Sequence, residues 1–213
     1  MDFISPALQK YSEDHTSPES VLLAEINRNT YAKVMQPRML SGHLQGRVLA
    51  MISHMIKPQR ILEIGTYTGY SALCLAEGLT ADGLLISIDA NEEFLSIAQK
   101  NIAAANTADK LKLIHGDALS IVPNLNLNFD LIFIDANKEA YPAYFEICLS
   151  ACKPGGFILA DNVLWSGNVI KPLSQQDEET EHIHAFNTKV QECEAVENVL
   201  LPVRDGIMLI RKK

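Results

Sequence analysis

The chain has 213 residues, of which 47% are hydrophobic and 21% charged, so it can bury a substantial core and is too apolar for a disordered chain. Its formal net charge of −8 argues against nonspecific binding to nucleic acid or to an anionic membrane. No apolar run approaches the roughly 18 residues that span a bilayer, and the first residues lack the basic-then-apolar order of a signal peptide. We therefore expect a cytoplasmic protein.

The amino-terminal part of the sequence is helical in pattern. Residues 19–34 follow Ser17-Pro18, and residues 42–56 form a second helical segment after Pro37. We expect these helices to cover a sheet or to supply a partner interface.

From residue 60 onward, short apolar runs alternate with helical segments. Strand–helix–strand units form right-handed crossovers, so this alternation predicts a parallel, doubly wound sheet. The expected strands are residues 60–64, 84–88, 111–114, 131–134 and 156–160. The expected helices between them are residues 69–79, 92–105 with Asn91 as cap, and 143–151, which Pro154-Gly155-Gly156 would terminate.

The carboxyl-terminal part predicts a helix at 177–194 and then a hairpin. Residues 200–203 and 207–210 are apolar, and the Asp205-Gly206 pair between them is a strong turn signal. The sequence therefore predicts an α/β, Rossmann-like, mostly parallel seven-stranded sheet that ends in an antiparallel hairpin. We expect one domain over residues 1–213, with a helical cover at 1–57 and the core at 58–213.

The four cysteines form no CxxC pair, which favours reduced core residues. Cys148 and Cys152 are four residues apart and could share a helix face, so a soft-metal site is the alternative.

A glycine turn follows the first expected strand. Its Gly65 and Gly69 match neither the dinucleotide GxGxxG motif nor a phosphate-binding P-loop. Glu63 just before the turn would repel a pyrophosphate but suit an amine, and Asp89 after the second strand could accept ribose hydroxyls. These acids point to a nucleoside without phosphates; the alternative is a structural turn beside a surface acid.

Two further strand ends carry acids. Asp135 follows the strand at 131–134, and Asp161-Asn162 follows the strand at 156–160. Open α/β sheets bind ligands at the carboxyl ends of their strands, and two carboxylates with a carboxamide suit a hard cation such as Mg²⁺. The alternative is that Asp161-Asn162 only caps a helix or turn.

Five segments together carry a family resemblance. The chain resembles the cation-dependent class I S-adenosylmethionine (SAM) O-methyltransferases, the group of caffeoyl-CoA and catechol O-methyltransferases and their bacterial relatives. The matching segments are residues 62–71, 116–118, 133–138 with Tyr141, 160–165 and 201–206.

The resemblance implies a role for each matching position. It implies cofactor contacts for Met39, Ser41, Glu63, Gly65, Tyr67, Ser71, Asp89, Asp117, Ala118 and Asp135. Glu63 and Gly65 would hold the methionine moiety, Asp89 the ribose, and Asp117 with Ala118 the adenine. Met39 and Ser41 would cover the cofactor, on a looser match. The cation, Mg²⁺ with Mn²⁺ or Ca²⁺ as alternatives, would be held by Asp135, Asp161 and Asn162.

The implied reaction is methyl transfer from the sulfonium of SAM to a phenolic oxygen, with Asp135 and Lys138 as catalytic residues. A free phenol has a pKa near 10 and is a poor nucleophile at neutral pH, whereas a cation that binds two adjacent hydroxyls stabilises the phenolate. Lys138 would accept the proton or stabilise the phenolate by its charge. The alternative is a solvated loop lysine.

The methyl acceptor is left open by the sequence. Asn137 stands where many relatives carry a second acid, and the amino-terminal stretch that shapes the acceptor pocket is not matched. A catechol, a caffeoyl-type ester or a flavonoid-like diphenol would fit, and we favour a small vicinal diphenol. The resemblance also implies a homodimer.

Two rival functions are considered. A tRNA hydroxyuridine O-methyltransferase would need a basic surface, for which Arg204, Arg211–Lys213 and Lys57–Arg60 are candidates, although the net charge opposes it. A non-catalytic binding protein would not need the intact set of Asp135, Lys138, Asp161 and Asn162.

Overall fold

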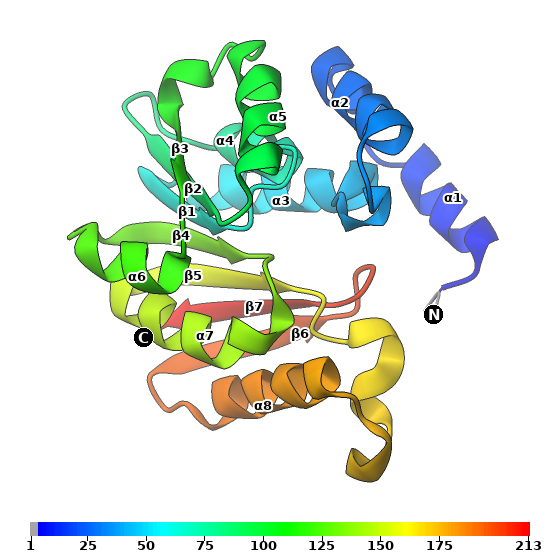
Figure 1. The fold of residues 1–213 in the computed structure, drawn as a ribbon, viewed down its shortest axis with the longest axis vertical. Coiled ribbons are helices and arrows are strands. Elements are labelled where there is room, and N and C mark those ends of the chain that lie inside the picture. Colours follow the sequence, from blue (N-terminus) through cyan, green and yellow to red (C-terminus); the bar gives the residue numbers. More distant parts are fainter. Residues whose placement is uncertain (1–3) are drawn as a thin grey trace. The chain divides into compact units, whose positions relative to one another are not determined.

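The computed structural model describes residues 4–213, which divide into two compact units, Ile4–Asp117 and Ala118–Lys213. Its strands follow the order β3-β2-β1-β4-β5-β7-β6, as labelled in Figure 1. The predicted Rossmann-like, mostly parallel seven-stranded sheet with a carboxyl-terminal antiparallel hairpin is thereby confirmed.

The unit Ile4–Asp117 contains three parallel strands, in which Glu63 pairs with Ser87 and Asp89 with His115. The strands are β1 (Arg60–Ile64), β2 (Leu84–Asp89) and β3 (Leu111–His115). The α-helices are α1 (Pro6–Asp14), α2 (Val21–Lys33), α3 (Gly42–Ile56), α4 (Tyr70–Ala76) and α5 (Glu92–Ala103), and the 3₁₀ turns are Pro37–Met39 and Ala108–Lys110. Helix α4 packs against α3 and β2, and α5 packs against β2 and β3.

Local sequence signals explain these helices. Asn91 accepts hydrogen bonds from the backbone N–H groups of Glu93 and Phe94, which confirms it as the cap of α5. Helix α1 was not predicted; it begins at a proline after the capping residue Ser5 and buries none of its residues. Helix α4 ends at Ala76 rather than at the predicted residue 79. The backbone N–H groups of the next three residues donate to carbonyl oxygens three positions earlier, which tightens the last turn.

The unit Ala118–Lys213 combines a parallel pair with the antiparallel hairpin. Its strands are β4 (Phe129–Ile134), β5 (Cys152–Asp161), β6 (Val196–Leu201) and β7 (Ile207–Lys212). Its α-helices are α6 (Ala118–Ile121), α7 (Tyr141–Ala151) and α8 (Glu178–Glu192), and its 3₁₀ turns are Val122–Asn124, Lys138–Ala140, Trp165–Ile170 and Leu173–Gln175. Every residue of β4 is buried, as expected of a strand covered on both faces. Helices α7 and α8 lie side by side in Figure 1.

The predicted starts of β5 and β6 in this unit were wrong. Strand β5 begins at Cys152, not at 156, and the Pro154-Gly155-Gly156 stretch lies inside it. The register shifts where Cys152 and Phe157 face β4, so a bulge accommodates these turn-forming residues. Strand β6 begins at Val196 rather than 200, because its alternately exposed residues hide the apolar pattern. Among residues 4–213, no helix is long and apolar enough to cross a membrane.

Candidate active site

The first site, which we call the β1–β2 cluster, lies at the carboxyl ends of these two strands and centres on Glu63. This carboxylate is fully buried. One oxygen accepts a hydrogen bond from the hydroxyl of Ser71 at 2.7 Å, and the other accepts from the hydroxyl of Ser87. Ser87 lies 2.6 Å from the hydroxyl of Thr66. The predicted pair Glu63 and Ser71 is therefore brought together, while Ser87 and Thr66 were missed although Ser87 interrupts an otherwise apolar strand.

Asp89 shapes the glycine turn of this cluster. Its Oδ2 accepts from the backbone N–H groups of Thr66 and Tyr67, each at 2.9 Å, and its Oδ1 accepts from Asn91 N–H at 2.9 Å. Gly65 has φ +100° and Tyr67 has φ +48°, so the turn uses left-handed backbone that such bonds must hold. An ionised carboxylate has about four acceptor positions, so Asp89 retains capacity for one more donor.

Tyr67 connects the turn to the segment before α3. Its hydroxyl lies 3.3 Å from the backbone oxygens of Met35 and Gln36 and donates to them, and burial raises the pKa of this phenol. Met39 and Ser41 lie a few residues further along the same segment, Met39 with 48% exposure and Ser41 buried. The structure therefore joins this segment to the β1–β2 cluster, and the cofactor contacts of Met39 and Ser41 stay predictions.

The segment after β3 also adjoins Asp89. The N–H group of Gly116 donates to the backbone oxygen of Asp89 at 3.0 Å, which holds the neighbouring Asp117 close to the end of β2. Asp117 is exposed. Ala118 is buried and begins α6 in the other unit, so we describe Asp117 alone as part of the β1–β2 cluster.

The second site, which we call the β4–β5 cluster, contains Asp135, Lys138, Tyr141, Asp161 and Asn162. Ile134 pairs with Ala160 in the parallel register, so the acids that follow them emerge side by side at the carboxyl ends of β4 and β5. Asp161 is only 3% exposed. Lys138 is 9% exposed, and its Nζ lies 3.2 Å from Oδ1 of Asp135.

Tyr141 links the lysine to the second acid. Nζ of Lys138 donates to the Tyr141 hydroxyl at 2.8 Å, and that hydroxyl donates to the backbone oxygen of Asp161 at 2.9 Å. Complete burial raises the pKa of Tyr141 well above its usual value, so the phenol stays neutral and can donate and accept together. Sequence reasoning included Tyr141 only as part of a matched segment, although its position three residues after Lys138 on a helical turn could have indicated the contact.

The chain after Asp161 turns sharply. Asn162 has φ +61°, and its N–H group donates to Oδ1 of Asp161 at 2.8 Å. Three residues later, the ring centroid of Trp165 lies 5.9 Å from Nζ of Lys138. The β4–β5 cluster is therefore assembled from side chains of two strand ends, one helical turn and this loop.

A family model described as O-methyltransferase matches residues 13–213. The chain belongs to this O-methyltransferase family. The family resemblance drawn from the sequence and the prediction of an enzyme are thereby confirmed.

Individual relatives of this methyltransferase agree with the family. A catechol O-methyltransferase of Niastella koreensis is 34% identical over 70% of this chain and 69% of its own length. Caffeoyl-CoA O-methyltransferase 2 of Zea mays is 33% identical over 79% of this chain and 68% of its own length. A solved O-methyltransferase from Bacillus cereus in complex with SAH is 32% identical, with a TM-score of 0.90 over 97% of each chain.

The donor atoms of the β4–β5 cluster of this methyltransferase fit a hard cation. Two carboxylates and a carboxamide offer oxygen ligands only, which Mg²⁺, Mn²⁺ and Ca²⁺ accept. Within residues 4–213, no group of three or more His, Cys, Asp or Glu side chains could hold a metal ion. The predicted ligand set contains only two residues of these types, Asp135 and Asp161, because its third member is Asn162. The donor chemistry fits, and the bound cation stays a prediction.

The structure does not support the alternative soft-metal site at Cys148 and Cys152. Cys148 lies on α7, whereas Cys152 is the first residue of β5, so the two cysteines do not share a helix face. Both are buried, and burial raises the pKa of Cys152 to about 11. A soft metal binds the thiolate, so this environment disfavours it.

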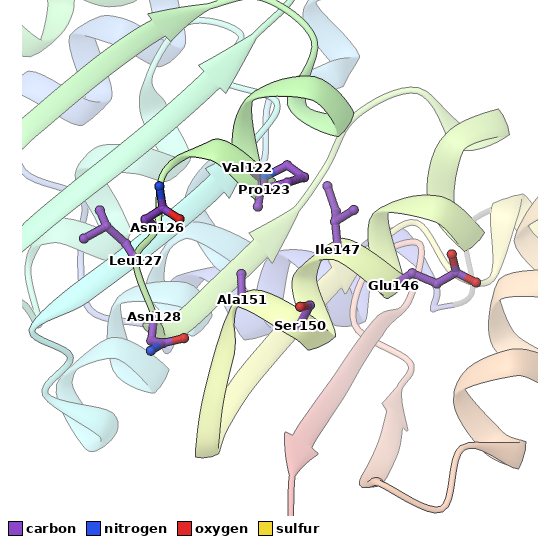
Figure 2. A pocket seen from close by; sticks show the side chains of 9 residues that line it. All are labelled: Val122, Pro123, Asn126, Leu127, Asn128, Glu146, Ile147, Ser150 and Ala151. Carbon is purple, nitrogen blue, oxygen red and sulfur yellow. The ribbon is translucent and has the colours of Figure 1, made fainter.

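A hollow of about 360 Å³ lies elsewhere in the unit Ala118–Lys213, as Figure 2 shows. It is lined by the segment 122–128 and by the last turns of α7, including Glu146 and Ser150. Asn128 precedes the first residue of β4, whereas Asp135 follows the last. Five strand steps of about 3.3 Å separate Phe129 from Ile134, so the hollow and the β4–β5 cluster lie at opposite ends of the strand.

Proposed function

We propose that this methyltransferase transfers the methyl group of SAM to one hydroxyl of a vicinal dihydroxy aromatic, such as a catechol or caffeoyl-type acceptor, with the help of a divalent cation. The observation that carries the proposal is the buried Lys138, bound to the carboxylate of Asp135 and connected through Tyr141 to Asp161. A lysine beside paired acids can act on an acceptor oxygen that these acids help to place. The similarity to a catechol O-methyltransferase supports the acceptor class.

The cofactor would bind the β1–β2 cluster. A buried carboxylate at Glu63 suits the ammonium group of the methionine moiety and would repel a phosphate. Asp89 would accept from a ribose hydroxyl with its remaining acceptor position, and Asp117 with Ala118 would line the adenine. The SAH complex of the Bacillus cereus relative supports this choice of cofactor.

The cation would be held by Asp135, Asp161 and Asn162, with Mg²⁺ as the first choice. When bound, such a cation lowers the pKa of a neighbouring hydroxyl and thus supplies a stronger nucleophile. Lys138 either accepts the phenolic proton at Nζ or stabilises the developing phenolate by its charge. Tyr141 accepts a hydrogen bond from Lys138 and restricts where its Nζ can lie.

We further propose a homodimer in the cytoplasm. Exposed apolar side chains on α1 and α3, among them Tyr11, Met51 and Met55, offer surface for a second copy. Four unpaired cysteines suit a reducing compartment. Sedimentation of the purified protein at micromolar concentration should show a dimer, and a monomer would refute this assembly.

No observation on the described residues favours tRNA as the acceptor. In the candidate basic patch, Arg211 pairs with Glu197, and Lys212 donates to the backbone oxygens of Leu149 and Cys152. These bonds reduce the donors left for phosphates, and the net charge of −8 adds repulsion.

The test is a transfer assay with SAM, Mg²⁺ and matched acceptors, followed by product mass. Vicinal diphenols should gain one methyl group, and EDTA should abolish the gain until excess Mg²⁺ is added. The matched control acceptors are phenols with one hydroxyl or with two hydroxyls in meta positions, which should not react. Equal turnover with and without EDTA would refute the cation, and equal turnover of single phenols would refute the acceptor class.

A further inference from the structure

The loop that carries Trp165 has an unusual backbone. Trp165 has φ +44° and Ser166 has φ +52°, followed by Gly167 at φ +79°. The first two are not glycines, so a left-handed conformation costs them free energy that other contacts must offset. We call residues 164–167 the tryptophan loop. Something outside the loop must hold it in this conformation.

The turn between β6 and β7 makes those contacts. Oδ1 of Asp205 accepts from the N–H group of Ser166 at 2.5 Å, and the backbone oxygen of Asp205 accepts from Leu164 N–H at 2.9 Å. Gly206 has φ +86°, and a Cβ added there would lie 2.6 Å from Cγ of Leu164. The Asp205-Gly206 pair, which the sequence indicates only as a hairpin turn, therefore also packs tightly against the tryptophan loop.

The tryptophan loop in turn borders the β4–β5 cluster. The ring centroid of Trp165 lies 5.9 Å from Nζ of Lys138, the proposed catalytic ammonium. Trp165 is half-buried, so part of its ring can contact another molecule. Asp205 is itself half-buried, and Lys138 is among the charges that act on its carboxylate. A change at Asp205 can therefore reach the lysine's surroundings through the position of this ring or through charge.

We propose that Asp205 is a positioning residue for the acceptor: its carboxylate holds the tryptophan loop so that Trp165 forms one wall of the acceptor site beside Lys138. The inference rests on the proposed function for the identity of the acceptor. A single hydrogen bond from Ser166 to a carboxylate is the contact that would fail first, because the Leu164 bond uses the backbone and survives any side-chain change.

The first test reads the loop without any activity, because Trp165 is the only tryptophan of the chain. Acrylamide quenching of the intrinsic fluorescence is measured for the wild type, Asp205→Ala and Asp205→Asn. Asp205→Ala should raise the quenching constant about twofold or more, because the ring gains exposure when the loop relaxes. Asp205→Asn keeps an oxygen acceptor for Ser166 N–H and should match the wild type. Glu197→Ala, which removes an exposed carboxylate from the same unit, is the control.

The second test measures the acceptor. Asp205→Ala should raise the KM for a vicinal diphenol about tenfold, in line with loss of a hydrogen bond to a charged group, while the Kd for SAM stays unchanged. Asp205→Asn should restore the KM to within about threefold, because the role depends on the bond and not on the charge. If Asp205 acted through its charge on Lys138, Asn would behave like Ala, and the proposal would be wrong.

The outcomes separate this inference from the proposed function. Unchanged quenching in a folded Asp205→Ala protein, with a Tm near that of the wild type, overturns the role of Asp205 in the loop. Increased quenching with an unchanged acceptor KM overturns the role of the loop in acceptor binding. If the wild type methylates no diphenol, the proposed function fails, and the quenching series still decides whether Asp205 holds Trp165.

Discussion

The two clusters both present carboxylates at strand ends, but they stabilise them differently. In the β1–β2 cluster, Glu63 accepts from serine hydroxyls and Asp89 from backbone N–H groups of the glycine turn. In the β4–β5 cluster, Asp135 faces an ammonium group and Asp161 contacts Asn162 N–H. Neutral donors fix an acid without cancelling its charge, so the first cluster suits a ligand with a cationic group. The lysine of the second cluster suits chemistry on an acceptor oxygen.

The largest expected effect is the loss of that lysine. Lys138→Met keeps a long apolar stem but removes the ammonium, and kcat should fall about 100-fold or more, as for the loss of a proton-transfer group. The Kd for SAM should not change, because the β1–β2 cluster is untouched. Initial rates and isothermal titration measure both quantities, and a kcat within threefold of the wild type would refute a catalytic Lys138.

The converse change acts on the β1–β2 cluster. Glu63→Gln removes the buried charge, and the Kd for SAM should rise about 10- to 100-fold, the loss expected for a hydrogen bond to a charged group. Glu93→Gln, an exposed acid in the first turn of α5, is the matched control and should leave the Kd unaltered. If both variants bind SAM like the wild type, Glu63 does not hold the methionine amine.

A smaller effect is expected from the phenol that connects Lys138 with Asp161. Tyr141→Phe leaves Lys138 without one of its two acceptors, so kcat should fall about tenfold while the KM for SAM stays constant. The buried partners lose a hydrogen bond, and the free energy of unfolding should fall by about 1–3 kcal/mol. Steady-state kinetics and urea unfolding measure these changes. Equal kcat in the two proteins would show that Tyr141 does not position the lysine.

The smallest effect lies outside both clusters. Asn91→Ala removes the cap of α5 and should lower the free energy of unfolding by about 1 kcal/mol. The N–H group of Asn91 still donates to Asp89, because that bond uses the backbone. Turnover should therefore be preserved, and a large loss of SAM affinity would show that the cap also shapes the cofactor site.

Sequence reasoning located the parallel strands well because their cores are short, mainly apolar runs that end at a glycine or an acid. Residues 60–64 and 131–134 are examples, the first found with its boundaries and the second short by two residues. The prediction of strand boundaries failed where residues typical of turns lie inside a strand. Pro154-Gly155-Gly156 has the composition of a loop, yet it lies between Cys152 and Phe157, which both pair with β4, so β5 includes it through a bulge.

The candidate site shows the same limit. Acids at strand ends could be predicted because register alone brings Asp135 and Asp161 together. The hydrogen bonds of Ser87 and Asp205 could not, because they depend on side-chain directions that no spacing specifies. The contact of Tyr141 with Lys138 is the exception, since their spacing of three residues could have indicated it. The positive φ angles of Trp165 and Ser166 could likewise not be predicted from the sequence, since neither residue type favours them.

The most direct test of the proposed metal-assisted transfer is electron paramagnetic resonance of Mn²⁺ titrated into the protein. We expect one bound ion per chain in the wild type, and a changed signal when a vicinal diphenol is added with SAM. Asp161→Asn should weaken binding markedly, since it removes a buried carboxylate that we propose as a ligand of the ion. A wild-type protein that binds no Mn²⁺ while it methylates a diphenol would contradict the metal-assisted reaction.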